Sequence, residues 1–460
     1  MMSMGAADEI ARFVHKLNTA NLPDEVVEKA RTCLLNGFGV ALGAMTSPFA
    51  STAAAAALAG NGQPSGGATL LVDGTPTSVA GATFANAALF HARSQEDTCG
   101  ASHFGAVLIP LLTAMIEAGA GTTRDFLVSL VAGYEAGGLV QRVCGRQTTA
   151  GGLRGSSLYG AIAAAAAAGK LMRFDVEKLA GAISAAASFA GGTMQSLAEG
   201  SDEWRYQLGL AGHAGLVAAE LARAGMSTPR AALEGPAGFA RVFGRSDWNS
   251  EAASRLGSEW SILKVTWKPF PICGAAQSPT ALALAARSEV GGGGVEAVTV
   301  RLPPLVAGYP GVNRKGPFPS VSAAQMSVSH AVALALIFGP PTMRQIAHYD
   351  DACAVSLSSR VSVLADETLD LAECIVSIRC IDGRTVTRER RGSATASTLS
   401  RSDVATMVRR IVAEEGHAAE VVDQLEAFVE ELPEASLSDV FGCFSMVRGA
   451  HADRARKVAS

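Results

Sequence analysis

The sequence predicts a mainly α protein in which both ends of the chain build one helical domain and a smaller α+β domain is inserted between them. Apolar residues recur at helical spacing almost without a break from the start of the chain to about residue 260. After Lys268 the pattern changes to short alternating segments, and helical periodicity returns beyond Ser400. We therefore place the helical domain at 1–268 and 397–460, and the α+β domain at 269–396.

Length and composition favour two domains with a large buried interior. The chain has 460 residues, too many for one ordinary core, and 48% of them are hydrophobic whereas only 17% are charged. So few charges suit a well-buried protein or one with a large oligomer interface. The formal net charge of -4 and the 6% of aromatic residues provide neither a basic patch nor stacking platforms, so we expect no nucleic-acid partner.

We expect neither a membrane span nor a secretion signal from the sequence. The two most apolar tracts, 51–60 and 160–169, are mostly alanine, which gains too little from lipid to predict a membrane span. The N-terminus carries Asp8 and Glu9 and lacks the basic start and long apolar run of a secretion signal. The eight cysteines are scattered without a CxxC pair, which favours free thiols over a structural zinc site. We expect a cytoplasmic protein without a membrane partner.

The helical elements are expected in order along the chain. Pro23 begins one helix, because its fixed φ suits a first turn and the acids Asp24 and Glu25 favour the positive end of the helix dipole. The expected helix faces are rich in alanine and glycine, and these small residues allow neighbouring helices to approach closely. This explains the high glycine count of the chain, 49. Ser402 is expected to cap the helix that follows the inserted domain. Further helices are expected at 84–92, 106–118, 124–143, 158–171, 176–189 and 212–224.

The inserted domain carries the strand signals. Four glycines at 291–294 indicate a flexible turn or linker, and residues 295–302 then alternate like a strand. Segments 374–380 and 384–391 flank an Asp-Gly turn and predict a β-hairpin. Segment 328–337 resembles a buried helix.

The polar centre of segment 81–112 is the strongest candidate for an active site. Helical patterns run up to this centre and resume after it, so its side chains gather where two buried helices meet. Glu96, Asp97 and His103 supply acid–base groups, and the Thr98 hydroxyl is suited to orient a substrate. The alternative is a helix cap made by Asp97 or Thr98. No spacing typical of metal ligands is present, so we expect no metal.

Two further polar runs precede apolar helices. Arg154 lies in a glycine-rich loop, where a guanidinium and free backbone N–H groups at a helix start suit a carboxylate or phosphate. The loop is not a P-loop because GK[ST] is missing, and a solvated loop arginine is the alternative. In the run 199–206, Arg205 and Tyr206 are candidates to bind a substrate anion, while Trp204 is expected to pack.

Lys268 lies at the predicted domain junction, in the run 267–274. Prolines nearby fix the backbone, and aromatic neighbours are expected to desolvate the amine partly, which helps a lysine to act as a base. The alternative is an amphipathic lysine with its head in water.

Five segments match one family in order and spacing: ARTCLLNGFGVALG at 30–43, the run 85–112, the run 200–215 ending in AGHAG, VTWKPFPICG at 265–274, and AAQMSVSHAVALALIFG at 323–339. In these segments the chain resembles the MmgE/PrpD family, which includes 2-methylcitrate dehydratase, cis-aconitate decarboxylase and iminodisuccinate epimerase. The resemblance covers nearly the whole chain. It implies a helical domain made by both chain ends with an inserted α+β lid, a homodimer, and chemistry without a cofactor in the cleft between domains.

Only some of the family's site residues are present in this chain. Ser94 stands where decarboxylase-like members have an aspartate, and Arg154 replaces the histidine of a His-Pro motif. Trp204 replaces a lysine, which leaves Arg205 as the remaining member of a basic pair. Groups associated with elimination or decarboxylation are therefore absent, while cationic binding groups remain. The retained positions are Thr98, His103 and Lys268.

We therefore predict an isomerase, an epimerase of the iminodisuccinate type, that abstracts a proton next to a carboxylate of a small di- or tricarboxylate. Arg154 and Arg205 each hold a carboxylate, while His103 and Lys268 act on opposite faces of the reacting carbon. The predicted catalytic residues are His103, Lys268, Asp97 and Tyr206, and the predicted substrate-binding residues are Arg154, Arg205, Thr98, Arg93, Ser94 and Gln277.

Two alternatives remain open from the sequence. The first is a lyase, either a dehydratase or a decarboxylase of a 2-methylcitrate- or aconitate-like acid, in which Tyr206, Asp97 or Tyr309 supplies the missing acid. The second is a catalytically silent relative that binds a carboxylate.

Overall fold

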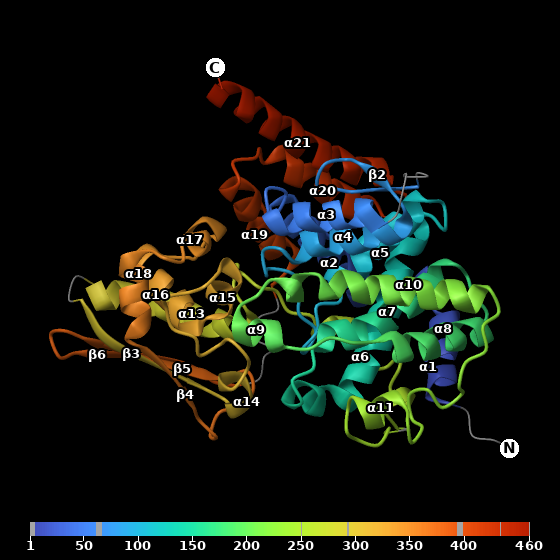
Figure 1. The fold of residues 1–460 in the computed structure, drawn as a ribbon, viewed down its shortest axis with the longest axis horizontal. Coiled ribbons are helices and arrows are strands. Elements are labelled where there is room, and N and C mark those ends of the chain that lie inside the picture. Colours follow the sequence, from blue (N-terminus) through green and yellow to red (C-terminus); the bar gives the residue numbers. More distant parts are fainter. Residues whose placement is uncertain are drawn as a thin grey trace.

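Two bodies of different composition make up the structure, one helical and one built on a β-sheet (Figure 1). The computed structural model describes residues 5–60, 67–249, 251–291, 294–392, 399–432 and 434–459. Helices dominate, and the strands of the second body lie between residues 295 and 390. The predicted fold class, mainly α with a small α+β part, is confirmed.

The helical body is built from the first half of the chain together with the C-terminal helices. Three short 3₁₀ turns and a two-stranded β-ribbon connect its helices: η1 (Thr19–Asn21), η2 (Glu203–Arg205), η3 (Ile262–Lys264), β1 (Ala68–Thr69) and β2 (Pro76–Thr77). Its helices are α1 (Ala6–Lys16), α2 (Asp24–Leu42), α3 (Pro48–Gly60), α4 (Val79–His91), α5 (Gly105–Glu117), α6 (Thr123–Ala150), α7 (Gly155–Leu171), α8 (Val176–Phe189), α9 (Gln195–Glu199), α10 (Gln207–Arg223), α11 (Phe239–Val242), α12 (Glu251–Ser254), α19 (Arg401–Glu414), α20 (Glu420–Glu431) and α21 (Leu437–Ala459).

Helix α7 occupies the centre of this body and packs against α5, α6, α8 and α10. Its alanine run is buried on every side, as expected for a helix that is apolar all round. Small residues make the close packing possible: a Cβ on Gly215 of α10 would lie 2.3 Å from the Cβ of Ala164 in α7. The alanine- and glycine-rich faces predicted from the sequence therefore serve helix–helix packing.

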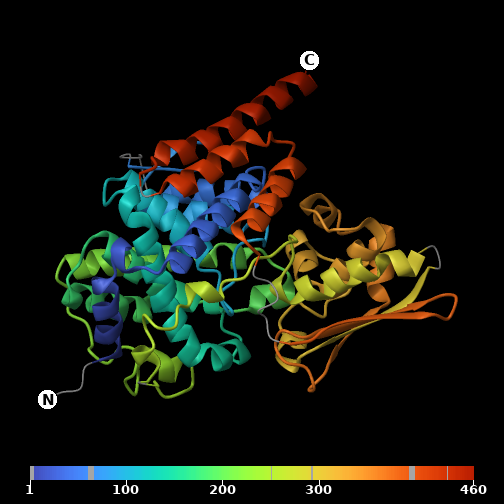
Figure 2. The ribbon, with the colours of Figure 1, turned by 180° about the vertical axis from the view of Figure 1, so that it is seen from behind.

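Both ends of the chain enter the same hydrophobic core. Phe38 of α2 packs edge-on against Phe428 and Phe444, at ring-centroid distances of 6.1 and 6.5 Å. Figure 2 shows the red C-terminal helices lying beside the blue N-terminal ones. Burial of these aromatic rings binds segments almost 400 residues apart (Phe38 and Phe428) into one unit.

The second body contains a four-stranded sheet in the order β4-β3-β5-β6. The strand and the hairpin predicted from the sequence are present as β3 (Val295–Leu302), β5 (Cys374–Cys380) and β6 (Thr385–Arg390), while the edge strand β4 (Val361–Ala365), parallel to β3, was not predicted. Helices α13 (Gly274–Val290) and α16 (Val328–Phe338) pack on the sheet. The shorter helices are α14 (Pro304–Ala307), α15 (Val321–Met326), α17 (Met343–Ala347) and α18 (Ala352–Ser359).

The C-terminal helix α19 begins earlier than predicted. Ser400, not Ser402, is the N-cap: its hydroxyl accepts the backbone N–H of Asp403, and the Asp403 carboxylate accepts the N–H of Ser400. This reciprocal capping box requires an acidic residue three positions after the cap, which Ser402 lacks. The predicted cap was therefore wrong by two residues.

The domain limits stay a prediction. The apolar side chains of Met194, Leu197 and Trp204 belong to the hydrophobic cluster of the sheet-containing body, although they precede residue 268. The predicted glycine linker lies partly outside the described residues, at 292–293, as does the predicted second boundary, at 393–398.

Within the described parts of the chain, we find no helix with the length and apolar character needed to cross a lipid bilayer.

Candidate active site

The polar centre predicted between residues 81 and 112 is held in place by two backbone features. Helix α4 ends at His91, and the chain then reverses at Ser94, which adopts a left-handed φ of 55°. Thr98 next forms an isolated antiparallel bridge with Thr266, with N–H to O distances of 2.9 and 2.8 Å. The bridge brings the loop after α4 beside the segment that carries Lys268.

Glu96 is the centre of the resulting cluster. One carboxylate oxygen of this buried side chain accepts from Nζ of Lys268 and lies 3.5 Å from Nδ1 of His103. The other oxygen lies 3.1 Å from Nδ1 of His91. Burial by itself raises the pKa of Glu96, but His91, Lys268 and His103 together hold that pKa well below its ordinary value. Glu96 is therefore a buried carboxylate anion surrounded by nitrogen donors.

His91 connects Glu96 to Arg154. Nε2 of His91 lies 2.6 Å from a guanidinium nitrogen of Arg154, and a guanidinium has only donors, so Nε2 accepts and the ring proton lies on Nδ1, facing Glu96. Burial lowers the pKa of His91 to about 4, in spite of the opposing effect of Glu96. Arg154 also donates to the carbonyl of Trp204 and packs on its ring at 5.2 Å. His91 is thus a neutral, fixed imidazole.

His103 has one fixed nitrogen and one unused nitrogen. Nδ1 lies 2.8 Å from the carbonyl oxygen of Asp97 and 3.5 Å from the Thr98 hydroxyl. Its backbone N–H donates to Ser156 at the start of α7. Among the described residues Nε2 has no hydrogen-bond partner, and the side chain keeps 18% exposure. Burial, followed by the charge of Lys268, lowers the pKa of His103 well below its ordinary value, so the ring is neutral near pH 7.

Asp97 faces away from this unused nitrogen, into the helical body. One carboxylate oxygen accepts the Tyr134 hydroxyl at 2.6 Å, and the other accepts the backbone N–H of Gly105, the first residue of α5, at 3.0 Å. Burial raises the pKa of Asp97 to about 6. Asp97 thus satisfies a backbone N–H at the start of α5, although Phe104 is the N-cap residue, and its catalytic role stays a prediction.

Arg205 and Tyr206 contact residues outside this cluster. The fully buried Arg205 donates to Ala92 and Ser322 at 2.9 and 3.0 Å, and also to Gln325. Its guanidinium is thus held by groups of the protein itself. Tyr206 precedes α10 and stacks on Phe84 at 6.4 Å. Their predicted roles in binding and catalysis stay predictions.

Arg93 and Gln277 support the segments that carry the polar cluster. Arg93 pairs with Glu414, the last residue of α19, and with Glu415, the next residue, at 2.6 and 3.0 Å. Gln277 donates to the carbonyl oxygens of Phe270 and Ile272, both at 2.9 Å, and so supports the loop after Lys268. These contacts tie the cluster to two other parts of the chain, and binding of substrate by either residue stays a prediction.

The structure therefore brings together His103, Lys268, Thr98 and Arg154 among the predicted residues, and adds His91 and Glu96. Both added residues belong to the polar centre seen in the sequence. Glu96 was named there as an acid–base group, but neither residue was included in the predicted catalytic or substrate-binding set. Spacing alone gave no reason to place Glu96 rather than Asp97 between the cations. In the described part of the chain, no three His, Cys, Asp or Glu side chains are arranged to hold a metal ion.

The comparisons with known proteins agree with this architecture. The model of the MmgE/PrpD N-terminal domain matches residues 8–251, and the chain belongs to the MmgE/PrpD family. A cis-aconitate decarboxylase of Aspergillus terreus is 25% identical over 372 residues, which cover 75% of each chain. A cis-aconitate decarboxylase-like protein of Aspergillus oryzae is 27% identical over 277 residues, covering 56% of this chain and 57% of the relative. The family resemblance predicted from the sequence is confirmed.

Proposed function

We propose that the chain is an acid–base enzyme, and specifically a lyase, that acts on a carbon next to a carboxylate of a small di- or tricarboxylic acid. The observation that carries the proposal is the pairing of His103, whose Nε2 is unused, with the Lys268–Glu96 ion pair beside it. Such a site supplies a base, a proton donor and a fixed positive charge within a few ångströms.

His103 is the proposed base. Its Nδ1 faces the Asp97 carbonyl oxygen, which accepts hydrogen bonds only, so Nδ1 carries the ring proton and Nε2 carries the lone pair. Burial keeps the ring neutral, and the 18% exposure of the side chain leaves a path for substrate. Proton transfer by a positioned histidine contributes on the order of 10² to 10⁴ in rate.

Lys268 is the proposed proton donor and charge stabiliser. Its Nζ donates to Glu96 as an ammonium group and is buried, so its charge acts in a poorly solvated site. In a dehydration, His103 takes the proton from the carbon next to the carboxylate and Lys268 protonates the hydroxyl that leaves as water. In a decarboxylation no proton is taken from the substrate: the carboxylate leaves as CO₂, the bonding electron pair stays on the carbon, and one proton must be delivered there. An ammonium beside that carbon provides both the proton and the charge that stabilises the carbanion.

A lyase is favoured over the epimerase that the sequence suggested. A base and a proton donor such as His103 and Lys268 serve both reactions, because an epimerase also removes a proton with one group and returns it with another, so the choice rests on the relatives. The relatives found are named as decarboxylases, which favours a lyase. The epimerase stays the second candidate, because a base and a proton donor, His103 and Lys268, lie beside the same carboxylate of Glu96.

Proton NMR in deuterium oxide tests the proposal. The purified protein is mixed separately with cis-aconitate, 2-methylcitrate and iminodisuccinate, with the His103→Gln variant as the control. We expect loss of a carboxylate or a new olefinic signal for one acid, abolished in the variant. Deuterium at the α-carbon together with the opposite stereoisomer would instead establish the epimerase. No change in any acid would contradict both and favour a silent carboxylate-binding relative.

We also propose that the protein works as a homodimer in the cytoplasm. Leu210, Val217 and Leu221 of α10 expose 56%, 37% and 36% of their surface, and Phe189 at the end of α8 exposes 44%. The three leucine and valine positions recur at helical spacing and form an apolar stripe, which suits a second copy of the chain. Light scattering of the purified protein should give twice the monomer mass of 47.0 kDa. A Leu210→Glu variant that stays dimeric would exclude this face.

A further inference from the structure

Asp97 joins three structural elements through different atoms. Its side chain accepts from Tyr134 of α6 at 2.6 Å and from Gly105, at the start of α5, at 3.0 Å. Its main-chain oxygen lies 2.8 Å from Nδ1 of His103. The residue is 2% exposed, and both carboxylate oxygens already have partners. Asp97 is therefore arranged to hold other groups rather than to meet a substrate.

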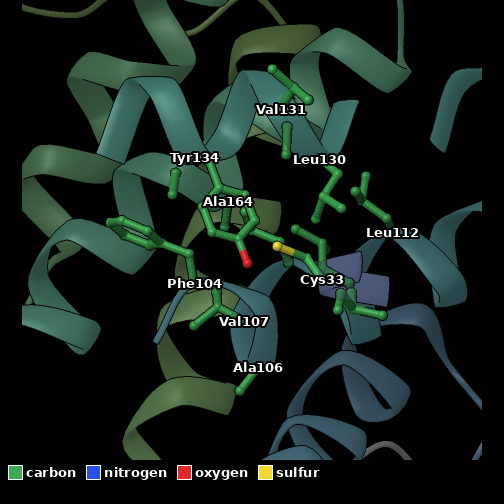
Figure 3. Close-up of a cluster of buried hydrophobic side chains, with 14 of the residues drawn as sticks. Cys33, Phe104, Ala106, Val107, Leu112, Leu130, Val131, Tyr134 and Ala164 are labelled. Atoms are coloured by element: carbon green, nitrogen blue, oxygen red, sulfur yellow. The ribbon is translucent and has the colours of Figure 1, made fainter. Parts of the chain in front are cut away.

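Tyr134 is itself fixed by its surroundings. Its ring packs edge-on against Phe104, with centroids 5.7 Å apart, and it is fully buried. Figure 3 shows the hydroxyl directed toward the sulfur of Cys33, and the two groups are in hydrogen-bond contact. Contacts with Cys33 on one side and Asp97 on the other fix the direction of the Tyr134 hydroxyl. Its hydrogen bond in turn limits the orientation of the Asp97 carboxylate.

We propose that Tyr134 and Asp97 are positioning residues that present the His103 ring with its Nδ1 protonated and its Nε2 free to accept the substrate proton. The inference rests on the proposed role of His103 as the base. Neither Tyr134 nor Asp97 touches the reacting atoms.

The physical reason lies in the two tautomers of a neutral imidazole. Histidine has no strong preference for one ring nitrogen, so the acceptor that faces it decides which nitrogen carries the proton. Two acceptors face Nδ1 of His103, the Asp97 carbonyl oxygen at 2.8 Å and a Glu96 carboxylate oxygen at 3.5 Å. The nearer one, the carbonyl, keeps this position only while its peptide keeps its direction. The same peptide carries the Thr98 N–H, which donates to Thr266 at 2.9 Å, while the two hydrogen bonds to the Asp97 side chain hold its other end. Loss of either side-chain bond lets that end move and shifts the carbonyl relative to the His103 ring.

The matched pair of variants is Tyr134→Phe and Tyr159→Phe. Both tyrosines are fully buried, and each donates its hydroxyl to one buried acceptor, since Tyr159 contacts the Thr148 hydroxyl at 2.7 Å. Tyr159 makes no contact with Asp97 or His103, so its variant controls for the general loss of a buried hydroxyl. Asp97→Asn provides a second disruption of nearly the same shape.

The first readout is independent of activity. Nitrogen NMR of protein labelled with ¹⁵N-histidine reports which ring nitrogen is protonated, and the His103 signals are identified by their absence in His103→Gln. We expect a single Nδ1-protonated form in the unaltered protein and in Tyr159→Phe, and a mixture of tautomers in Tyr134→Phe and Asp97→Asn. Protonation on Nε2 in the unaltered protein, or an unchanged spectrum in both disrupting variants, would overturn the proposal.

The second readout is the split between kcat and KM with an acid that the enzyme turns over. Misplacing the base affects the chemical step, so we expect kcat to fall about tenfold or more in Tyr134→Phe with KM nearly unchanged, and no such change in Tyr159→Phe. A kcat equal in the two variants would contradict the positioning role. If no acid is turned over, the proposed function fails, while the NMR result still decides the tautomer.

Discussion

At the scale of single residues, the site depends on a carboxylate that is buried and fully surrounded. Desolvation of Glu96 is unfavourable, and it is offset by Lys268 and by the two imidazoles of His91 and His103. Removing one partner of such a buried pair leaves an uncompensated charge and costs about 3–5 kcal/mol. The cluster is therefore expected to be sensitive to changes of charge that leave its shape intact.

Glu96→Gln removes the charge at the centre while keeping the volume. Lys268 then loses the anion that fixes it, so we expect kcat/KM to fall about 100-fold, together with lower stability. Steady-state kinetics and urea unfolding measure the two effects. The control is Glu117→Gln, at the far end of α5, where the carboxylate accepts hydrogen bonds from Thr69 and, among the described residues, from no other. Equal kinetics in the two variants would refute the central role of Glu96.

His91 makes stability depend on pH. The unfolded chain binds a proton at the ordinary histidine pKa of 6.5, whereas burial lowers the folded-state pKa to about 4. The unfolded state thus binds more protons between these values, so the free energy of unfolding falls as the pH drops from about 6.5 toward 4, by on the order of 3 kcal/mol for this group.

The variant His91→Gln tests this dependence, because glutamine is able to contact both Glu96 and Arg154 but does not titrate. Chemical unfolding at several values between pH 7.5 and 4.5 should show a smaller loss of stability in the variant. His348→Gln, at an exposed position, serves as the control and should follow the unaltered protein. Parallel curves for all three proteins would show that His91 does not carry the effect.

At the scale of elements, the ends of helices decide where the functional groups lie. α4 ends at His91, α5 begins at Gly105 under the Asp97 carboxylate, and α7 begins just after Arg154. Free N–H groups at a helix start attract acceptors, and Asp97 meets this need at Gly105, the first residue of α5. Ser156, at the start of α7, accepts the N–H of His103 just before α5. The chemistry is therefore concentrated in the short loops between long buried helices.

The capping box of α19 gives a test at this scale. Ser400→Ala removes the hydroxyl that accepts from Asp403 and should destabilise the protein by about 1 kcal/mol. Ser402→Ala, two residues later in the same exposed turn, should change stability by less than about 0.5 kcal/mol. Urea unfolding of both variants measures the difference, and a larger effect at Ser402 would restore the cap predicted from the sequence.

At the scale of the whole molecule, the C-terminal helices complete the body and hold the site. Arg93, in the loop after α4, pairs with Glu414 and Glu415 at the C-terminal end of α19. Arg410 of the same helix donates to the carbonyl of Pro269, which also accepts from Gln95 at 3.2 Å. The residue that follows Lys268 is thus held jointly by the N-terminal loop and the C-terminal helix.

A shortened chain that ends after Ser400 tests whether the C-terminal helices are needed to complete the helical body. It lacks the buried side chains of Val408, Phe428 and Phe444, whose absence exposes the apolar face of α2. We expect no cooperative thermal unfolding and a lost near-ultraviolet circular dichroism signal. The control ends after His451 and keeps these residues, so it should unfold cooperatively. A folded short form would show that the first part of the chain is stable alone.

Much of the architecture was predictable because periodicity is a local property. The strand Val295–Leu302 and the first strand of the hairpin, Cys374–Cys380, lie where alternation and the Asp-Gly turn placed them. β4 was missed because its partner, β3, is almost 60 residues away and parallel, so no nearby turn signal marks the pairing. The cap at Ser400 was missed because Ser402 offers a similar side chain in the same turn.

The sequence by itself determined the fold class, the family and the polar loops that gather the chemistry, because these depend on residue types and spacing within short segments. The tertiary structure decided which residues meet there. Glu96 rather than Asp97 pairs with Lys268, since the bridge between Thr98 and Thr266 sets the direction of each side chain. Arg205 is held by groups of the protein itself, a result of packing between segments more than 100 residues apart, Arg205 and Ser322. Local patterns carry no information about such pairing, because it depends on the directions in which distant segments cross.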